Sequence, residues 1–218
     1  MIRVITLLKS NPGWSAEYVY RLQRAVQRHL TVPHEFLCLT DIPLEVPTLP
    51  LITMPEIDLT DIPKFWYKVQ MFRPEFELND QCLFIDLDTV IKNNIDHYIT
   101  AFESHDFLMA TSPFRGRIAC SYLMWINQDL SHLWHTFGQR AVLDWNQQYH
   151  KGRIDLYGDQ GFVSEHAEHG FIQDQLPETD IVRITRGESH DQACMLIFGG
   201  KRKPWAMPGH PDIEKHWI

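Results

Sequence analysis

The sequence has few cysteines, no long apolar run and no excess of basic charge, and each absence excludes a class of protein. Its 218 residues include four cysteines, and no two of them form a C-x-x-C pair. A zinc knuckle or a redox-active dithiol is therefore not indicated, and buried free thiols are expected. A reducing, cytoplasmic location is the default prediction for such a chain. The four cysteines are Cys38, Cys82, Cys120 and Cys194.

No apolar stretch reaches the roughly 18 residues that a membrane-spanning helix needs, so no transmembrane segment is expected. The apolar start, residues 1–8, is too short for a signal peptide with a cleavage site and predicts a first strand. The formal net charge is −8 and the isoelectric point about 5.8. An acidic surface does not match a phosphate backbone, so a nucleic-acid partner is not expected.

The composition is that of a globular protein, with 44% hydrophobic and 22% charged residues. This length suits one domain spanning residues 1–218. Strand-like and helix-like segments alternate, which predicts an α/β fold with a mixed sheet. Strands are expected over 2–8, 35–39, 82–85, 106–110, 119–126, 181–184 and 195–198, with a short one near 51–53 in the proline-rich connection 42–63. Helices are expected over 17–30 (with Ser15 as N-cap), 64–72, 130–149 and 161–169.

Two carboxylates follow the most apolar of these strands. Asp86 and Asp88 come directly after residues 82–85, and the spacing i, i+2 places both on one side of an extended chain. Ligands in open α/β sheets bind beyond the carboxyl ends of strands. Paired carboxylates form a hard oxygen site that suits Mg²⁺ or Mn²⁺, and such an ion bridges to a diphosphate. The segment therefore predicts a site for a metal and a diphosphate.

The same residues also fit a second motif. Residues 86–90, Asp-Leu-Asp-Thr-Val, match the nucleophile motif of haloacid-dehalogenase-type phosphatases, in which the first aspartate is phosphorylated. That family begins with this strand and needs a downstream Gly-Asp-x-x-x-Asp. Here some 80 residues precede the strand, and Val163 stands where the second downstream acid belongs. The phosphatase is therefore the less favoured alternative.

Along its whole length the chain resembles the small bacterial-type glycosyltransferases with the nucleotide-diphospho-sugar transferase (A-type) fold, related to the glycogenin-like family 8 group. No single segment is decisive, but the order and spacing of the segments are specific. The segments that carry the resemblance are residues 14–22, 36–41, 66–72, 83–91, 120–125, 158–160 and 200–205.

The resemblance implies a hexosyltransferase-type enzyme with a single-domain Rossmann-like A-type fold and a mixed central sheet. It implies a nucleotide-diphosphate sugar donor (a UDP-sugar), Mn²⁺ or Mg²⁺ held by Asp86 and Asp88, and an acceptor that is a glycan, lipid or protein. Asp159 and Gln160 correspond to the catalytic and donor-sugar contacts. The remaining donor- and nucleotide-binding positions that it implies are Thr6, Leu8, Lys9, Trp14, Lys68, Lys201 and Lys203.

One departure from the family concerns the metal. The family has Phe-His-Gly before its basic, proline-containing tail, and that histidine completes the metal site; here Gly199 replaces it. A related spacing places the histidine at position 197, which is Ile197. His190 and His210 are candidate replacements. A catalytically inactive nucleotide-sugar-binding protein is therefore a second hypothesis beside the active transferase.

Aromatic and histidine residues have plainer interpretations. Trp205 follows the cationic loop and is the best candidate for a ring that stacks on the sugar. The pairs His132 with His135 and His166 with His169 share helical faces. Neither pair has a third ligand nearby in the sequence, so surface or half-buried helix positions are expected rather than zinc ligands.

Overall fold

The computed structural model describes residues 1–52, 64–112, 116–138, 141–145, 151–153, 155, 158–184, 189–200 and 202–218. Its strands are β1 (Ile2–Leu8), β2 (His34–Thr40), β3 (Thr48–Pro50), β4 (Cys82–Ile85), β5 (Val90–Ile91), β6 (Phe107–Thr111), β7 (Ala119–Ile126), β8 (Gly170–Phe171), β9 (Ile181–Arg183) and β10 (Met195–Ile197). Its α-helices are α1 (Ala16–His29), α2 (Asp96–Phe102), α3 (Ser131–Thr136), α5 (Gly158–His166) and α6 (Pro211–His216). Its 3₁₀ helices are η1 (Lys64–Phe72), η2 (Pro74–Phe76), η4 (Ile172–Asp174) and η5 (Pro204–Ala206).

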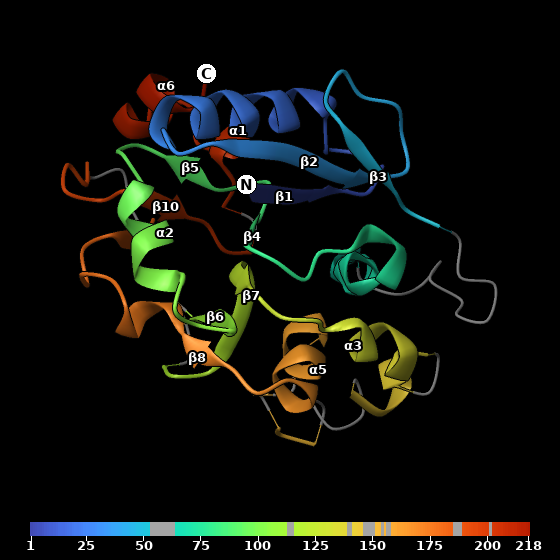
Figure 1. Ribbon diagram of the computed structural model, residues 1–218. Helices are drawn as coiled ribbons and strands as arrows, with labels where there is room; N and C mark the ends of the chain where they lie inside the picture. The colour runs from blue at the N-terminus through green and yellow to red at the C-terminus, as the bar shows by residue number, and fades with distance from the viewer. Residues whose placement is uncertain are drawn as a thin grey trace.

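A seven-stranded mixed sheet with the order β3-β2-β1-β4-β7-β6-β8 forms the centre of the fold (Figure 1). Strands β1 to β4 pair in parallel, whereas β7 runs antiparallel to both β4 and β6. A smaller sheet, β5-β10-β9, lies beside it. The carboxyl ends of β1 and β4 therefore lie side by side, and the start of the antiparallel β7 lies next to the end of β4.

Alternating side chains of the central strands build two hydrophobic cores, one on each face of the sheet. Leu83 and Ile85 of β4 pack with α1 and α2, whereas Cys82 and Phe84 pack with η1, α3 and α5. Figure 1 shows α1 on one side of the sheet and α3 and α5 on the other. All four β4 side chains are buried, so the strand is held on both faces. This burial fixes the position of the acidic residues that follow it.

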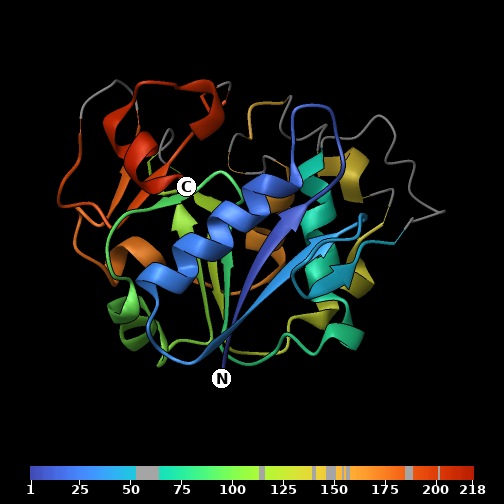
Figure 2. The same cartoon turned by 90° about the horizontal axis from the view of Figure 1, so that it is seen from above.

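The C-terminal segment docks along α1. Arg21, Arg24 and Arg28, which recur at helical spacing, donate to the carbonyl oxygens of Trp217, Ile218 and His216. Figure 2 shows α1 lying over the strands with the red C-terminal elements beside it. The ring of Trp205, in η5, stacks on Tyr18 of α1 at 4.1 Å. These contacts attach the segment after β10 to the body of the molecule.

Most predicted elements are confirmed, several of them to the residue. Strands 2–8, 82–85 and 119–126 have the predicted bounds. The helix predicted at 17–30 is α1, and Ser15 caps it by accepting a hydrogen bond from the Glu17 amide. The strand expected near 51–53 is displaced: β3 ends at Pro50, Leu51 and Ile52 follow it outside the strand, and Thr53 lies outside the described residues. No helix among the described residues is long and apolar enough to cross a membrane.

The prediction of one helix over 130–149 is wrong. Helix α3 ends at Thr136, because Phe137 takes an extended conformation with ψ 132° and turns its ring into the core. Its amide still bonds back to the carbonyls of Leu133 and Trp134. Gly138, the poorest helix former after proline, follows directly. Residues 141–145 are helical again, and residues 139–140 and 146–149 of the predicted helix lie outside the described residues.

Candidate functional site

A cleft of about 350 Å³ lies where β1, β4 and β10 end. This is the edge at which parallel α/β sheets bind ligands. Four of its lining side chains are lysines and two are carboxylates, with aromatic and apolar groups between them. The lining residues are Leu7, Lys9, Asn11, Trp14, Lys64, Phe65, Lys68, Asp86, Leu87, Asp88, Cys120, Tyr122, Ile197, Phe198 and Lys203.

A buried lysine stands at the base of this cleft. Lys68, on η1, is 5% exposed, and its Nζ lies 2.9 Å from Oδ1 of Asp86 and 3.7 Å from Oδ2 of Asp159. The same Nζ donates to the carbonyl and to the hydroxyl of Ser121 at 3.0 Å each. Ser121 in turn donates to Asp159 at 2.7 Å. One cation thus connects the end of β4, the start of β7 and the first turn of α5.

This network sets the charge of its members. Burial alone would lower the pKa of Lys68, but Asp86 and Asp159 raise it well above its ordinary value. Burial raises the pKa of Asp159, and this outweighs the opposing effects of Lys68 and Ser121. Lys68 is therefore a permanent cation beneath the cleft, held between Asp86 and the buried Asp159, whose burial raises its pKa.

The second carboxylate of the cleft has its own lysine. Lys203, in the segment after β10, forms a short ion pair with Oδ2 of Asp88. Burial raises the pKa of Asp88; Lys203 lowers it, and the neighbouring Asp86 raises it further. Lys203 also lies 5.8 Å from the ring centre of Trp14. Asp86 and Asp88 thus face the same cleft, each paired with a different lysine.

A third lysine closes the side of the cleft next to β1. Lys9 forms an ion pair with Asp41, which also accepts hydrogen bonds from the amide and hydroxyl of Ser10. Although burial acts to raise it, the hydrogen bonds from Lys9 and Ser10 hold the pKa of Asp41 at about 2. Because Asp41 follows β2, this pair ties the ends of β1 and β2 together.

The structure brings six of the predicted site residues to the cleft: Lys9, Trp14, Lys68, Asp86, Asp88 and Lys203. Thr6 and Leu8 are instead buried in the fold, at 0% and 1% exposure. The alternation of a strand turns Leu7 to the cleft and Leu8 into the core beneath α1. Lys201 lies outside the described residues.

The two predicted catalytic residues lie behind the cleft wall, at the start of α5. Asp159 is 4% exposed and reaches the cleft only through Lys68 and Ser121. Gln160 is half-buried, and its Oε1 accepts from the thiol of Cys120 at 3.1 Å. Cys120 itself lines the cleft.

Other cleft residues were not predicted from the sequence. Lys64 and Phe65 begin η1, and Phe65 precedes Lys68 by three residues, the spacing at which side chains of a 3₁₀ helix align. That spacing was the signal in the sequence from which a place in the cleft could have been predicted. The role of Ser121 and Tyr122 depends on the antiparallel pairing of β7 with β4, for which the sequence carries no local signal.

Trp14, not Trp205, is the tryptophan of the cleft. Trp205 does not line the cleft, and its ring has neighbours in the fold: Tyr18 stacks on it at 4.1 Å, and Trp14 lies T-shaped to it at 5.0 Å. The prediction that Trp205 stacks on a sugar is therefore not supported. Trp205 instead supports Trp14 and anchors the segment that carries Lys203.

The candidates for a third metal ligand do not reach the carboxylates. His190 and His210 are absent from the cleft lining, whereas Ile197, one of the two positions considered for the family histidine, lines it with an apolar side chain. Among the described residues, no histidine, cysteine or further carboxylate completes a group of three ligands with Asp86 and Asp88.

A glycine holds the start of α5 against the cleft wall. Gly158 has φ +61°, and a Cβ there would lie 2.4 Å from the Phe65 ring. Gly158→Ala is expected to destabilise the protein by about 2 kcal/mol or more, because left-handed strain is added to a clash in the cleft wall. Gly200→Ala is the matched control, since Gly200 has the same φ with no atom within 4 Å. Equal losses of unfolding free energy in urea for both variants would show that the Phe65 contact has no effect.

Comparison with known proteins identifies the fold. No protein-family model matches the sequence, and no curated protein is significantly similar to it. Among solved structures, an active-site mutant of LgtC aligns with a TM-score of 0.62 and 10% identity, over 98% of this chain and 94% of that chain. The galactosyltransferase LgtC with donor and acceptor sugar analogs aligns with a TM-score of 0.59 and 11% identity.

The glycosyltransferase GlyE of Streptococcus pneumoniae TIGR4 aligns with a TM-score of 0.62 and 14% identity, over 100% of this chain. This chain spans only 60% of the GlyE chain. At these identities the comparisons establish the fold: the chain has the α/β fold of these glycosyltransferases, with a mixed central sheet, as the sequence predicted.

Proposed function

We propose that the protein is a glycosyltransferase that moves a hexose from a nucleotide-diphosphate sugar, a UDP-sugar, to an acceptor. The observation that carries this proposal is the cleft itself, in which Asp86 and Asp88 face Lys9, Lys68 and Lys203 beside Trp14. The lysines favour a ligand with a polyanionic centre, and the ring of Trp14 offers a surface for a planar base. A nucleotide-diphosphate sugar has these features, and the fold shared with LgtC and GlyE supports the assignment.

The proposed mechanism is electrostatic. When the bond between the anomeric carbon and the diphosphate breaks, negative charge grows on the departing diphosphate. Lys203 and Lys68 stabilise that charge, and Lys68 does so from a position that is fixed before the reaction. Lys203 leaves Asp88 to contact the diphosphate, while the buried Lys68 stays in place. Trp14 borders the nucleotide at the end of β1.

Asp86 and Asp88 are the residues that would hold Mg²⁺ or Mn²⁺. Their oxygens are hard donors, and the Asp86 side chain is 32% exposed, so the donor set and its access suit such an ion. Magnesium commonly takes one or two protein carboxylates and completes its shell with phosphate oxygens and water, which agrees with the absence of a third ligand among the described residues. When bound, the ion supplies further neutralisation of the diphosphate.

We assign Asp159 and Gln160 to the wall next to the donor sugar. Asp159 acts on the reaction through Lys68, which it holds in place together with Ser121. It is therefore a positioning residue in this proposal. Gln160 orients the Cys120 side of the cleft through its contact with the thiol.

Donor binding tests the proposal directly. UDP-, GDP-, dTDP- and CMP-sugars are compared by thermal shift, each with Mn²⁺ and with EDTA, and the UDP-sugars are expected to raise the melting temperature by several degrees when Mn²⁺ is present. Without a third protein ligand, Mn²⁺ alone is expected to shift it little. No shift with any donor would overturn the assignment of the cleft.

Turnover distinguishes the two hypotheses that share this site. The active transferase is expected to release UDP from the bound donor, slowly to water and faster with an acceptor. Binding without any release of UDP would instead support an inactive binding protein, the alternative suggested by Gly199. Phosphate release from an aryl phosphate would support the phosphatase; Val163, at the position of its second acid, is buried in the core.

A further inference from the structure

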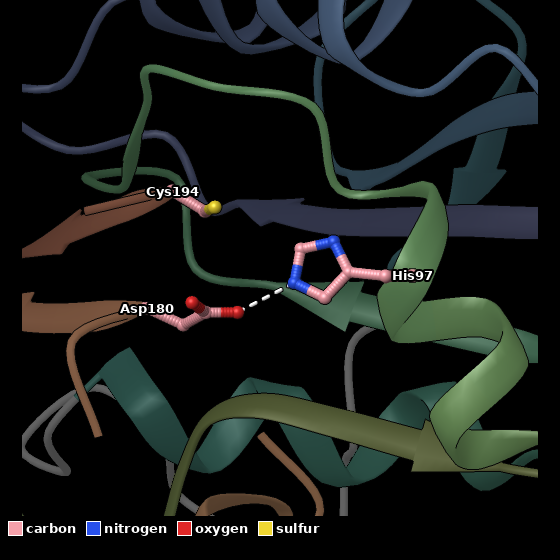
Figure 3. Close-up of side chains that lie close together, drawn as sticks. All are labelled: His97, Asp180 and Cys194. Carbon is pink, nitrogen blue, oxygen red and sulfur yellow. Dashed lines mark hydrogen bonds and ion pairs between the residues drawn. The ribbon is translucent and has the colours of Figure 1, made fainter. Parts of the chain in front are cut away.

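Three side chains that can bind a metal ion converge beside α2, outside the cleft. His97 lies in the first turn of α2, Asp180 directly precedes β9, and Cys194 directly precedes β10. One ligand atom from each, an imidazole nitrogen, a carboxylate oxygen and the thiol sulfur, lies within 4.8 Å of the other two. Figure 3 shows the three side chains directed toward one another from these separate elements.

The two inner members of this cluster have few partners. Asp180 and Cys194 are 6% and 8% exposed, whereas the His97 side chain is 44% exposed. Nε2 of His97 and Oδ2 of Asp180 are 2.5 Å apart, and this is the only side-chain hydrogen bond that Asp180 makes with the described residues. The Cys194 thiol is free and makes none with them. Apart from the contact with His97, the buried carboxylate of Asp180 and the buried thiol of Cys194 have no side-chain hydrogen-bond partner among the described residues, so both are available to a cation.

We propose that His97, Asp180 and Cys194 form a zinc site whose fourth position is open to solvent on the His97 side. Sulfur, nitrogen and one carboxylate oxygen are the donors that zinc takes, whereas a thiol disfavours the hard Mg²⁺ and Mn²⁺. The donor set thus separates this site from Asp86 and Asp88, which offer oxygen alone. The proposal does not depend on the transferase assignment.

The geometry needs only a small adjustment. Ligand atoms bound to one zinc at about 2.0–2.3 Å lie roughly 3.3–3.8 Å from one another in a tetrahedral site. Nε2 of His97 must therefore move away from Oδ2 of Asp180, which the exposed histidine side chain allows, while the sulfur draws closer. Asp180 is already fixed, because its carbonyl accepts from the amides of Cys194 and Met195 at 2.9 Å.

The site lies where three elements of the fold meet. Zinc would join the first turn of α2 to the starts of β9 and β10. Strand β10 runs from Met195 to Ile197, so the cluster at its start lies about 10 Å along the chain from Ile197 and Phe198 in the cleft. The ion would fix the small sheet that carries this side of the cleft.

Metal binding to the intact, metal-free protein tests the proposal. We expect one equivalent of Zn²⁺ per chain in a competition titration with a chromophoric chelator, and one equivalent of Co²⁺ with a thiolate-to-metal absorption band. His97→Ala, at the exposed position, is expected to weaken Zn²⁺ binding more than 100-fold, because it removes one of the three ligands, and losing a residue that only orients a ligand already costs about 10- to 100-fold. Cys194→Ser is expected to abolish the thiolate band. Zn²⁺ is expected to raise the melting temperature of the wild type by several degrees and that of His97→Ala little.

Two control variants separate this site from other ligands. His132→Ala removes an exposed histidine of α3, and Asp88→Asn removes a carboxylate of the cleft. Both variants are expected to bind Zn²⁺ as the wild type does. The proposal is overturned if the wild type binds Zn²⁺ no better than His97→Ala, or if either control loses the ion to the same extent. Donor binding to the cleft is scored separately with Mn²⁺, so failure of one site leaves the other unaffected.

Discussion

Asp88→Asn is expected to lower sugar transfer by ~100-fold to 1,000-fold, the size of effect seen when one preorganised charge or donor is removed from a site. The same variant is expected to keep or raise the stability of the protein. Burial raises the pKa of Asp88 in the folded state, so at neutral pH its ionised form costs stability relative to the unfolded chain. A neutral asparagine of the same shape removes that cost.

The sign of this effect follows from the direction of the shift. A carboxyl group whose pKa is higher in the folded protein reduces stability above its unfolded pKa, and this loss disappears as the pH falls and the group is protonated. Kinetics of UDP release with Mn²⁺ and chemical unfolding at neutral pH measure the two halves of the prediction. Asp174→Asn is the control, because Asp174 pairs with Arg117 at the surface outside the cleft. Equal activity in Asp88→Asn and Asp174→Asn would show that Asp88 does not take part in sugar transfer.

Lys68→Met is expected to have the largest effect on folding. The lysine is 5% exposed and compensates both Asp86 and Asp159, so its removal leaves two carboxylates without a cation in a buried network. Breaking a buried pair in this way costs about 3–5 kcal/mol. Chemical unfolding measures the loss of stability, and donor turnover is expected to be lost with it.

A second variant keeps this prediction testable if the single variant does not fold. Adding Asp159→Asn to Lys68→Met removes one of the uncompensated charges and is expected to recover part of the stability without recovering turnover. Lys64→Met is the matched control, since Lys64 lines the same cleft from the same helix but is exposed. It is expected to leave stability nearly unchanged. Recovery of turnover in the double variant would show that Lys68 stabilises the fold but does not contribute to the reaction.

The sequence by itself determined the elements whose signals are local. Four apolar residues before Asp86 specify a strand buried on both faces, and β4 forms at that position. Ser15 before a 3.6-residue apolar period specifies the start of α1. The segment order along the chain also indicated the fold shared with LgtC and GlyE.

The predictions from the sequence were less accurate where an element or a side chain depends on residues far away in the chain. The aromatic residues after position 130 suggested one helix, but the choice between a longer helix and a buried Phe137 depends on the core that receives its ring. The function of Trp205 likewise depended on Tyr18, which lies on a distant helix and covers it. Such competition between local propensity and packing is decided by buried area that the sequence does not display.

Only the tertiary structure decided which charges meet. Lys68, Asp86, Ser121 and Asp159 are brought together by the pairing of β7 with β4 and by the packing of η1 and α5 behind them. In the same way α2 and the starts of β9 and β10 bring His97, Asp180 and Cys194 together from positions far apart in the chain. Electrostatic and metal-binding chemistry depends on distances of a few ångströms between side chains, and strand pairing across the sheets sets those distances.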